Sequence, residues 1–377
     1  MFRFLLPTFL LAGLLGCQLE PASSYAEDLA CVSDSVLIHT ESAAAEEILE
    51  VALAYDRGTG ISAAVVIDGE LVFASAVGSA EKRFPLRAFA PMRTGSVAKL
   101  FTSVAVARLV EMDRINLDDP IVDLVPETPD VGITPFYLGT HTSGIRHYNF
   151  NKLSEANNRT HYESLTDALN IFIDDPLRSV PGDEFHYSSF GFNLLGVVVE
   201  RAYGTDYDDA LNELVAEPFR LSSLAIDEAG VVLPCQPDFS TIAFGRKRIA
   251  APRRDNSDLY PSGGLLVSAP DLASFVYAVF NSEFLQPSTI ELFLQETITP
   301  DGSQTGYTFG WQIEKDEDGS VEWYGHGGQI NGAYASVRYY PELNMAIAGM
   351  TNYNYWLTSK RPEFFAVIRE EFPGLFR

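Results

Sequence analysis

The sequence predicts an α+β fold, in which one antiparallel sheet is built from both ends of the chain and a helical lobe is inserted between them. Two observations support this fold class. Strand-like stretches occur at 61–78 and again at 308–352, whereas the residues between about 94 and 290 are rich in helical spacing. The length of 377 residues, with 46% hydrophobic, is ample for a large core. We expect five or more strands, flanked by helices.

The N-terminal part of the predicted sheet consists of a helix followed by a hairpin. The stretch "ESAAAEEILEVALAYDRG" at 41–58 is typical of a helix and ends in glycine, a common stop signal. The stretch "ISAAVVIDGELVFASAVG" at 61–78 places Asp68 and Gly69 between two apolar runs. Asp-Gly in that setting is the strongest short-range signal for a hairpin. We therefore expect two paired strands here.

The C-terminal part is predicted to supply the remaining strands. The stretches "TFGWQIE", "SVEWYGHGG", "GAYASVRYY" and "NMAIAGMTN" follow one another with turn residues between them. The tail "RPEFFAVIREEF" then returns to helical spacing. The helical lobe inserted before these strands is broken by loops that contain proline and glycine.

The first stretch, "MFRFLLPTFLLAGLLGC", predicts an exported protein. One arginine precedes an apolar run that is too short to span a membrane as a mature helix, as in a secretory signal. The four residues that end at Cys17 resemble a bacterial lipobox, which implies cleavage before Cys17 and attachment of lipid to its thiol. An ordinary signal peptide with an incidental cysteine is the alternative.

These signals divide the chain into three parts. We expect a lipoprotein-type signal peptide at 1–16, a tether at 17–41 and one hydrolase-sized domain at 42–377. The expected location is the periplasm, with the protein attached to a bacterial membrane, preferably the outer membrane, through a lipid anchor on Cys17.

Composition narrows the classes of partner. The net charge is −25, from 26 basic and 51 acidic residues, so the surface repels nucleic acid and we expect no nucleic-acid partner. No histidine or cysteine cluster has the spacing of a metal site, and we expect neither a metal nor another cofactor. Cys31 and Cys235 could pair in an oxidising compartment, but their spacing does not decide this.

The segment "TGSVAKLFTSVAVARLV" at 94–110 contains the strongest candidate site. Ser96 and Lys99 lie one helical turn apart and therefore on the same face. The apolar neighbours of Lys99 reduce the hydration of its ammonium group, which lowers its pKa towards that of a useful base. Backbone N–H groups at the helix start can stabilise an oxyanion at Ser96. A second Ser-x-x-Lys, from Ser79 to Lys82, falls in an expected turn and lacks this context. The structural alternative is a helix-capping serine with a surface lysine.

Further segments, in a fixed order, resemble those of one enzyme superfamily. "LGTHTSGI" at 138–145, "FHYSSFGFNLLGVVVERAYG" at 185–204, "YPSGGLLVSAPDLASF" at 260–275 and "YGHGGQINGAYASV" at 324–337 follow the Ser96 helix. Together they resemble the serine β-lactamase and penicillin-binding protein superfamily, in its class C-like branch. The subgroup most similar to this chain is that of the LACTB-type β-lactamase-like proteins. The resemblance covers roughly residues 45–355 and implies a β-lactamase/transpeptidase-like fold.

The resemblance implies a role for each catalytic residue. Ser96 would be the nucleophile that forms an acyl-enzyme, and Lys99 would accept or relay its proton. Tyr187 would act as the base in acylation and as the acid towards the leaving group. A free tyrosine has a pKa near 10, so neighbouring cations such as Lys99 would have to lower that pKa.

The resemblance also implies a substrate-binding set, with one departure. The family usually has asparagine at the position of Ser189, and the shorter serine reaches less far towards a substrate amide. Efficient hydrolysis of β-lactams is therefore in doubt. His326 would donate a hydrogen bond to a substrate carboxylate or to Tyr187, and Gly328 would let a substrate lie along the strand edge. The N–H of Gln329 would complete the oxyanion hole.

The leading functional prediction is a serine hydrolase that cleaves an amide or ester bond in a small-molecule or peptide substrate through an acyl-enzyme. Three alternatives stay open. They are a penicillin-binding or peptidoglycan-ligand binding protein with slow turnover, a true β-lactamase, and a scaffold or filament-forming protein with a residual site. The sequence decides neither the physiological substrate nor the oligomeric state.

Overall fold

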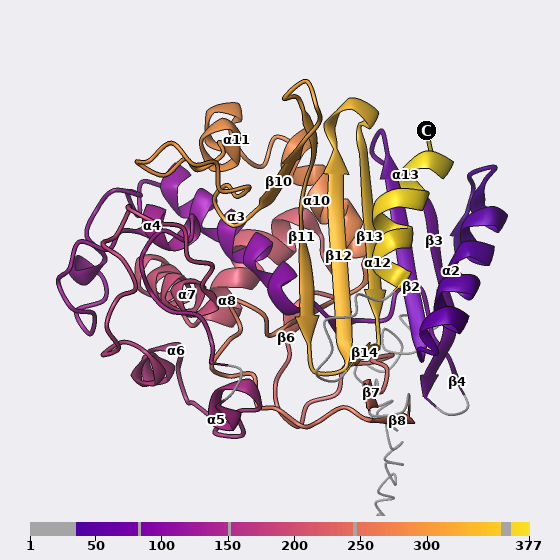
Figure 1. Ribbon diagram of the computed structural model, residues 1–377, viewed down its shortest axis with the longest axis horizontal. Helices are drawn as coiled ribbons and strands as arrows, with labels where there is room; N and C mark the ends of the chain where they lie inside the picture. The colour runs from indigo at the N-terminus through magenta and orange to yellow at the C-terminus, as the bar shows by residue number, and fades with distance from the viewer. Residues whose placement is uncertain (1–34, 82–83, 150–151, 244–246, 356–362) are drawn as a thin grey trace, which may run out of the picture.

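The computed structural model describes residues 35–81, 84–149, 152–243, 247–355 and 363–377. It confirms the α+β class, with a large antiparallel sheet at the centre and a helical lobe on one side (Figure 1). The predicted signal peptide at 1–16 and most of the tether at 17–41 lie outside the described residues, so the expected division of the chain stays a prediction.

The sheet has eight strands, more than the minimum of five that we expected. The main path runs β1-β3-β2-β13-β12-β11-β10, and β4 pairs with β3. The bounds of the strands in this sheet are β1 Val36–Leu37, β2 Gly60–Ile67, β3 Glu70–Glu81, β4 Phe84–Pro85, β10 Gln312–Lys315, β11 Val321–Ile330, β12 Ala333–Tyr340 and β13 Met345–Thr351. Two small sheets contain β5 Met92–Arg93, β6 Ala225–Ile226, β7 Ser240–Ala243, β8 Lys247–Ala250, β9 Leu265–Val267 and β14 Tyr353–Tyr355.

Helices cover both faces of the sheet. Their bounds are α2 Ser42–Asp56, α3 Ala98–Glu111, α4 Pro135–Gly139, α5 Leu153–Ala156, α6 Leu165–Ala168, α7 Ser189–Tyr203, α8 Tyr207–Leu211, α9 Glu217–Phe219, α10 Ala269–Asn281, α11 Pro287–Leu294, α12 Glu363–Ala366 and α13 Phe372–Leu375. In Figure 1, α2, α12 and α13 lie on one face of the sheet, and α3, α7 and α10 lie behind it or in the lobe beside it.

The predicted hairpin forms strands β2 and β3. Asp68 and Gly69 both adopt positive φ angles, 50° and 85°, as the tight turn between twisted strands requires. The predicted helix at 41–58 is α2, but it ends two residues earlier than expected. Arg57, rather than the glycine, adopts the left-handed conformation that ends it.

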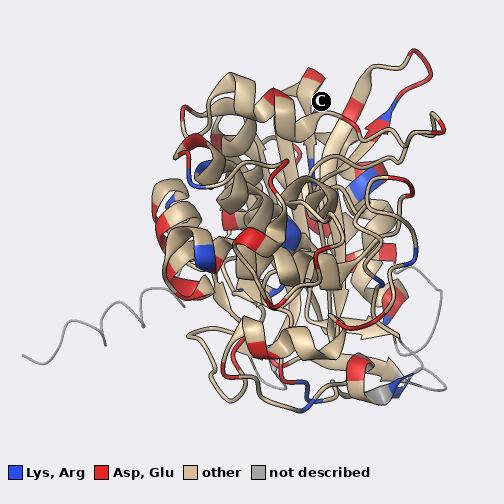
Figure 2. Ribbon diagram, turned by 90° about the vertical axis from the view of Figure 1, so that its left-hand side faces the viewer, with Lys and Arg blue, Asp and Glu red and all other residues tan. Residues whose placement is uncertain are grey.

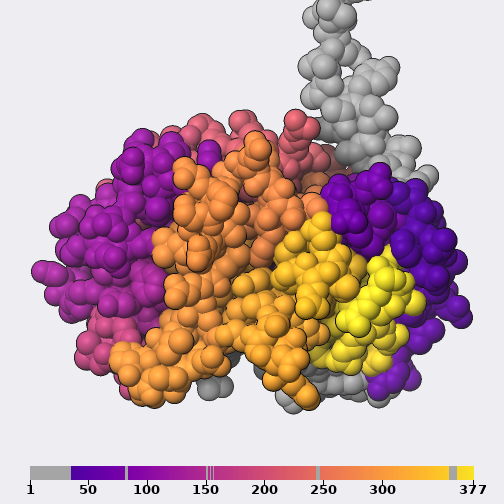
Figure 3. Space-filling model, turned by 90° about the horizontal axis from the view of Figure 1, so that it is seen from above, coloured from indigo at the N-terminus to yellow at the C-terminus, as the bar shows by residue number. Residues whose placement is uncertain are grey.

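The two ends of the chain meet in the middle of the sheet. Strand β13 pairs with β2 over its whole length, from Met345 opposite Ile67 to Thr351 opposite Ile61. Seen from above, the yellow C-terminal segments lie directly beside the indigo N-terminal ones (Figure 3). The expectation of one sheet assembled from both termini is therefore confirmed.

Two hydrophobic cores lie on opposite faces of this sheet. One packs the sheet against α3, α7 and α10 and includes Phe101, Phe192 and Phe275. The other packs the sheet against α2, α12 and α13, with Phe73 and Phe364 at its centre. Helix α3 is buried on nearly all sides, which explains why its sequence is apolar around the whole helix. The start of this helix is therefore held rigidly against the sheet.

Candidate active site

Ser96 and Lys99 lie where the chain leaves β5 and enters α3. Gly95–Val97 form a single 3-10 turn, and the α-helix starts at Ala98. Ser96 is half-buried and Lys99 is fully buried. Lys99 Nζ lies 3.2 Å from Ser96 Oγ, so the structure brings these two side chains together as the sequence predicted. The other Ser-x-x-Lys differs from our expectation, because Ser79 lies within strand β3 rather than in a turn.

Uncharged groups surround the amine of Lys99. Nζ donates to the carbonyl oxygen of Ser262 at 2.7 Å and to Ser189 Oγ at 3.0 Å, in addition to the contact with Ser96. Burial lowers the pKa of Lys99 well below its ordinary value of 10.5. Because none of its three hydrogen-bonding partners carries a charge, nothing in this set offsets the loss of hydration. The site therefore favours the neutral amine.

Tyr187 completes the cluster, but its pKa moves in the direction opposite to our expectation. Its hydroxyl is hydrogen-bonded to Ser96 and Ser189, and Lys99 Nζ lies 5.0 Å from the centre of its ring. Burial raises the pKa of Tyr187 above its ordinary value of 10, and the neighbouring Tyr307 acts in the same direction. Loss of hydration is the largest cause of this shift, so Tyr187 keeps its proton at neutral pH.

Ser189 lies deep in the site rather than at its open side. It is the first residue of α7, is 2% exposed and contacts Lys99 directly. The neighbouring Ser188 caps the same helix by accepting from the N–H of Gly191 at 2.9 Å. The N–H of Ser188 donates to Nδ1 of the buried His141 at 3.2 Å. Ser189 therefore contacts both Lys99 and Tyr187, where it can position the amine and link the two groups.

The wall opposite the helix is strand β11, whose main chain lies directly against the Ser96 turn. A Cβ atom at Gly328 would come within 2.0 Å of the Thr94 carbonyl oxygen and 3.0 Å of Ser96 N. A Cβ atom at Gly95, where φ is +51°, would lie 2.6 Å from Gln329 N. Only glycine fits at these two positions. Because neither residue has a Cβ atom, the strand and the turn approach closely, and the N–H groups of Ser96 and Gln329 border the same narrow space.

His326 lies on the same strand, and its ring is buried beside those of Tyr187 and Tyr307 rather than at an open surface. It is 3% exposed, and Nδ1 contacts the carbonyl oxygen of Gly327 at 2.6 Å. Burial and, to a lesser degree, Lys99 lower the pKa of His326 to about 3. Nδ1 therefore carries the proton and donates it to Gly327. The remaining nitrogen, Nε2, is buried without a hydrogen-bonding partner, and the His326 ring lies 6.2 Å from that of Tyr187.

Two aromatic residues of the site were not predicted from the sequence. The Tyr148 hydroxyl lies 3.1 Å from Ser262 Oγ, and the Tyr307 ring lies 5.8 Å from that of Tyr187. Tyr148 closely follows the "LGTHTSGI" segment, so its position in the chain could have drawn attention to it. Tyr307 comes from the irregular segment before β10, and no sequence signal marks it.

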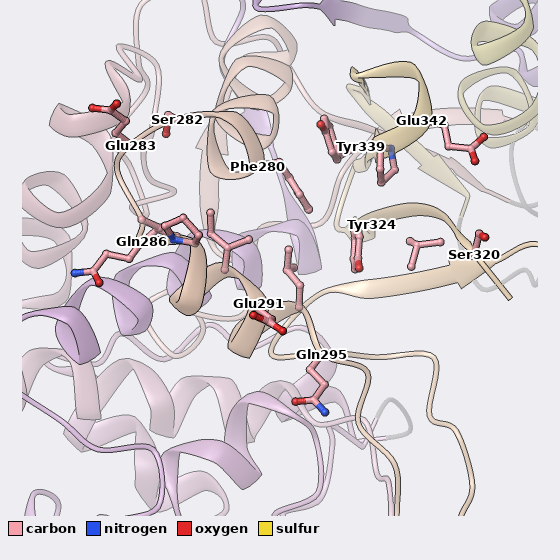
Figure 4. A pocket seen from close by; sticks show the side chains of 16 residues that line it. Phe280, Ser282, Glu283, Gln286, Glu291, Gln295, Ser320, Tyr324, Tyr339 and Glu342 are labelled. Carbon is pink, nitrogen blue, oxygen red and sulfur yellow. The ribbon is translucent and has the colours of Figure 1, made fainter.

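A hollow of about 1220 Å³ lies elsewhere on the molecule. It runs between the α10–α11 connection and the ends of β11 and β12, over the rings of Phe280, Tyr324 and Tyr339 (Figure 4). None of the predicted site residues lines it. Within the described residues, no group of three or more His, Cys, Asp or Glu side chains is placed to hold a metal.

Three further features were compared with the expected location of the protein: its charge, its helices and its cysteines. The chain has 51 acidic and 26 basic residues, and the acidic positions are spread over the ribbon in Figure 2. In the described part of the chain, no helix is both long and apolar enough to cross a membrane. Cys235 is disulfide-bonded, whereas Cys17 and Cys31 lie outside the described residues. The lipid anchor on Cys17 therefore stays a prediction.

Comparison with known proteins gives consistent matches over most of the chain. The family model "Beta-lactamase" matches residues 46–369. The human "Serine beta-lactamase-like protein LACTB, mitochondrial" is 27% identical over 286 residues, which are 57% of this chain and 52% of that protein. This chain thus spans about half the length of that relative. Esterase EstB of Burkholderia gladioli is 25% identical, over 74% of this chain and 85% of the esterase.

Solved structures show the same fold. A D-stereospecific amidohydrolase from Streptomyces superposes with a TM-score of 0.73 at 22% identity, covering 87% of this chain and 98% of that one. A penicillin-binding protein from Bacillus halodurans superposes with a TM-score of 0.71, also at 22% identity, covering 81% and 95%. At this level of identity the two structures bear on the fold alone.

Proposed function

Because the chain belongs to the β-lactamase family and is a serine hydrolase of that family, we propose that it cleaves an ester or a small-peptide amide through an acyl-enzyme on Ser96. The observation that best supports this proposal is the buried, uncharged environment of Lys99 beside Ser96. A lysine that is fully protonated could not accept a proton, whereas a neutral amine can.

The hydrogen-bonding capacity of the neutral amine decides whether the Ser96 hydroxyl donates to Lys99 or accepts from it. A neutral amine has two N–H groups and one lone pair, whereas Lys99 Nζ has three oxygen partners. The carbonyl oxygen of Ser262 can only accept, so it uses one N–H. If Ser189 Oγ accepts the other, the lone pair faces the Ser96 hydroxyl. That hydroxyl then donates to Lys99, which is the geometry of a nucleophile with its general base.

The proposed reaction uses the side chains and main-chain N–H groups described above, the substrate and water. Ser96 Oγ forms a bond to the substrate carbonyl carbon as its proton moves to Lys99. The charge on the carbonyl oxygen is stabilised by the N–H groups of Ser96 and Gln329. The bond to the leaving group then breaks as Tyr187 gives that group a proton, and Lys99 restores the proton on Tyr187 through Ser189. Water hydrolyses the acyl-enzyme by the reverse sequence.

Labelling with a fluorophosphonate probe, followed by mapping of the modified residue, tests the nucleophile. We expect modification at Ser96, and the Ser96→Ala variant should lose both labelling and turnover of activated esters. Ser79→Ala is the matched control and should retain both, because Ser79 belongs to the other Ser-x-x-Lys. Labelling that survives in Ser96→Ala would contradict the proposal. Stoichiometric labelling of Ser96 without turnover would instead indicate a binding protein of the penicillin-binding type.

We also propose that the protein is a lipoprotein anchored through Cys17 to a bacterial membrane. The support comes from the sequence, in which a short apolar run ends at a lipobox-like Leu-Leu-Gly-Cys. When the full chain is expressed in a bacterial host fed with labelled fatty acid, the label should enter the protein. Cys17→Ser should abolish the labelling, and Cys31→Ser should not. A mature N-terminus mapped downstream of Cys17 would contradict the proposal.

A further inference from the structure

We infer that the active site selects substrates that carry no negative charge next to the bond that is cleaved. Esters and amides with a free carboxylate beside that bond are then poor substrates. Penicillins and cephalosporins belong to this disfavoured class, because a carboxylate is attached to the ring fused to the lactam. The inference rests on the proposed serine-hydrolase function and specifies which charge the preferred substrates carry beside the cleaved bond.

The first support is that the arginines closest to the site in the chain are already paired with carboxylates. Arg93, Arg146 and Arg254 lie close in the chain to residues of the site. Arg93 contacts Asp227 at 2.7 Å, Arg146 contacts Glu155 at 2.8 Å and Asp175 at 2.6 Å, and Arg254 contacts Asp258 at 2.7 Å. Each of these arginines is held by at least one carboxylate, so none of them offers a free charge to a substrate carboxylate.

The second support is the state of the two nitrogen bases at the reacting centre. Lys99 has no exposed surface, and all three of its polar contacts go to oxygens of the protein. His326 is 3% exposed, and its protonated nitrogen is held by the carbonyl of Gly327. Neither side chain presents a cation at the open side of the site. This differs from the expectation that His326 donates to a substrate carboxylate.

The third support is the aromatic lining of the open side. The half-buried ring of Tyr187 is hydrogen-bonded to Ser96, and the rings of Tyr307 and His147 lie 5.8 and 5.3 Å from it. The half-buried Tyr148 contacts Ser262, whose carbonyl binds Lys99. Burial and Lys99 lower the pKa of His147 to about 4, so this ring is also neutral at neutral pH. The faces of aromatic rings carry partial negative charge and therefore favour neutral or cationic groups over anions.

A matched pair of esters tests the inference on the wild-type protein. One is the acetate ester of a nitrophenol that carries a carboxamide, and the other has a carboxylate in place of the carboxamide. Each kcat/KM is divided by the rate of hydroxide-catalysed hydrolysis of the same ester, which removes the difference in leaving-group reactivity. We expect the neutral ester to be favoured by roughly 30-fold or more, since an anion that loses water without a partner is strongly disfavoured.

High salt distinguishes discrimination at the active site from repulsion of anions by the net charge of the protein. The net charge of −25 repels anions at long range, but about 1 M salt reduces the screening length to about 3 Å. The preference should therefore persist in about 1 M sodium chloride. Equal turnover of both esters, or a preference that disappears at high salt, would overturn the inference and leave the proposed hydrolase intact. If neither ester is turned over in a Ser96-dependent way, the proposed function itself fails.

A pair of substitutions at Tyr307 gives an independent test. Tyr307→Lys places a cation at the half-buried edge of the site, and Tyr307→Met is the control of similar length without charge. We expect the lysine variant to lower the preference for the neutral ester at least about 5-fold relative to the methionine variant. Circular dichroism and fluorophosphonate labelling of both variants check that they are folded. Equal preferences in two folded variants would contradict the inference.

Discussion

Lys99 shows that the chemistry of this site depends on what a side chain lacks as much as on what it touches. Its hydrogen bonds alone would suit an ammonium group, because all three partners are oxygens that can accept. Full burial without a carboxylate partner instead favours the neutral amine. The same loss of hydration keeps the proton on Tyr187. The two groups therefore hold complementary states, one able to accept a proton and the other able to donate one.

These states predict the pH dependence of catalysis. The free enzyme needs Lys99 unprotonated, so kcat/KM for a neutral ester should rise with pH up to the lowered pKa of Lys99 and then level off. Because the pKa of Tyr187 is raised, kcat/KM should show no decline between about pH 8 and pH 10. Steady-state kinetics in overlapping buffers measure the profile. A decline centred below pH 10 that is absent in Tyr187→Phe would show that the tyrosine pKa is not raised.

Ser189 gives a second prediction at the scale of one side chain. Its hydroxyl accepts from Lys99 Nζ at 3.0 Å, and its removal would leave the amine free to turn away from Ser96. We expect Ser189→Ala to lose about 1–2 kcal/mol of transition-state stabilisation, a roughly 5- to 30-fold fall in kcat/KM. Ser189→Thr retains a hydroxyl and should recover most of this loss. An alanine variant with unchanged kcat/KM would mean that Ser189 does not position Lys99.

At this scale, the sequence predicts contacts between residues that are close together in the chain. Ser96 and Lys99 could be paired from the sequence because helical geometry fixes their distance. The direction of the Tyr187 pKa could not be predicted, because it depends on burial by segments that are far away in the chain. Tyr307, which raises that pKa further, is one such case.

At the scale of elements, the site is the contact between the Ser96 turn and strand β11. Sequence patterns predicted both elements, and the "YGHGGQINGAYASV" segment marked the correct strand. They did not predict which glycine makes the contact. The alternation of side chains along β11 decides this, since Gly328 faces Ser96 whereas Gly327 faces the opposite side near Phe365.

The two glycines provide a matched pair of substitutions. Gly328→Ala should separate the strand from the Ser96 turn, because its Cβ atom would lie 2.0 Å from the Thr94 carbonyl oxygen. We expect a loss of kcat/KM of about 100-fold or more, as for the removal of an oxyanion-hole donor, together with a lower Tm. For Gly327→Ala the nearest contact of the Cβ atom is 3.9 Å, and both quantities should stay near wild type. Esterase kinetics and thermal melts measure them. Equal effects of the two substitutions would contradict this account.

At the scale of the molecule, one buried carboxylate joins the two ends of the chain. Asp56, at the end of α2, is 2% exposed. It accepts from the hydroxyls of Tyr353 and Tyr355 at 2.8 and 3.0 Å, and from the N–H groups of Glu363 and Phe364 at 2.9 and 3.4 Å. The sequence predicted the helix and the strands but gave no sign of this link, because an isolated aspartate carries no pattern.

Removing this carboxylate should destabilise the whole domain. Asp56→Ala leaves several buried donors without a partner, and we expect a loss of about 3 kcal/mol or more in the free energy of unfolding. Asp56→Asn keeps one acceptor oxygen of similar shape and should lose less. Denaturant unfolding at neutral pH measures both. Esterase activity per folded molecule should be unchanged, because Asp56 belongs to the core on the other side of the sheet. An alanine variant as stable as wild type would contradict the assigned role.

The pairing of β13 with β2 also has a consequence for how the protein is made. Ser96 is synthesised early, but β11, which forms the wall of its site, and β13, which completes the sheet, follow more than two hundred residues later. Contacts between such distant segments form slowly, and they cannot form at all while the C-terminal strands are still in the ribosome. A nascent chain would therefore have the serine and the lysine but no assembled oxyanion hole. If Ser96 is the nucleophile, as proposed, it would become reactive only after β11 and β13 have been added, and truncated copies that lack these strands would not form an acyl-enzyme.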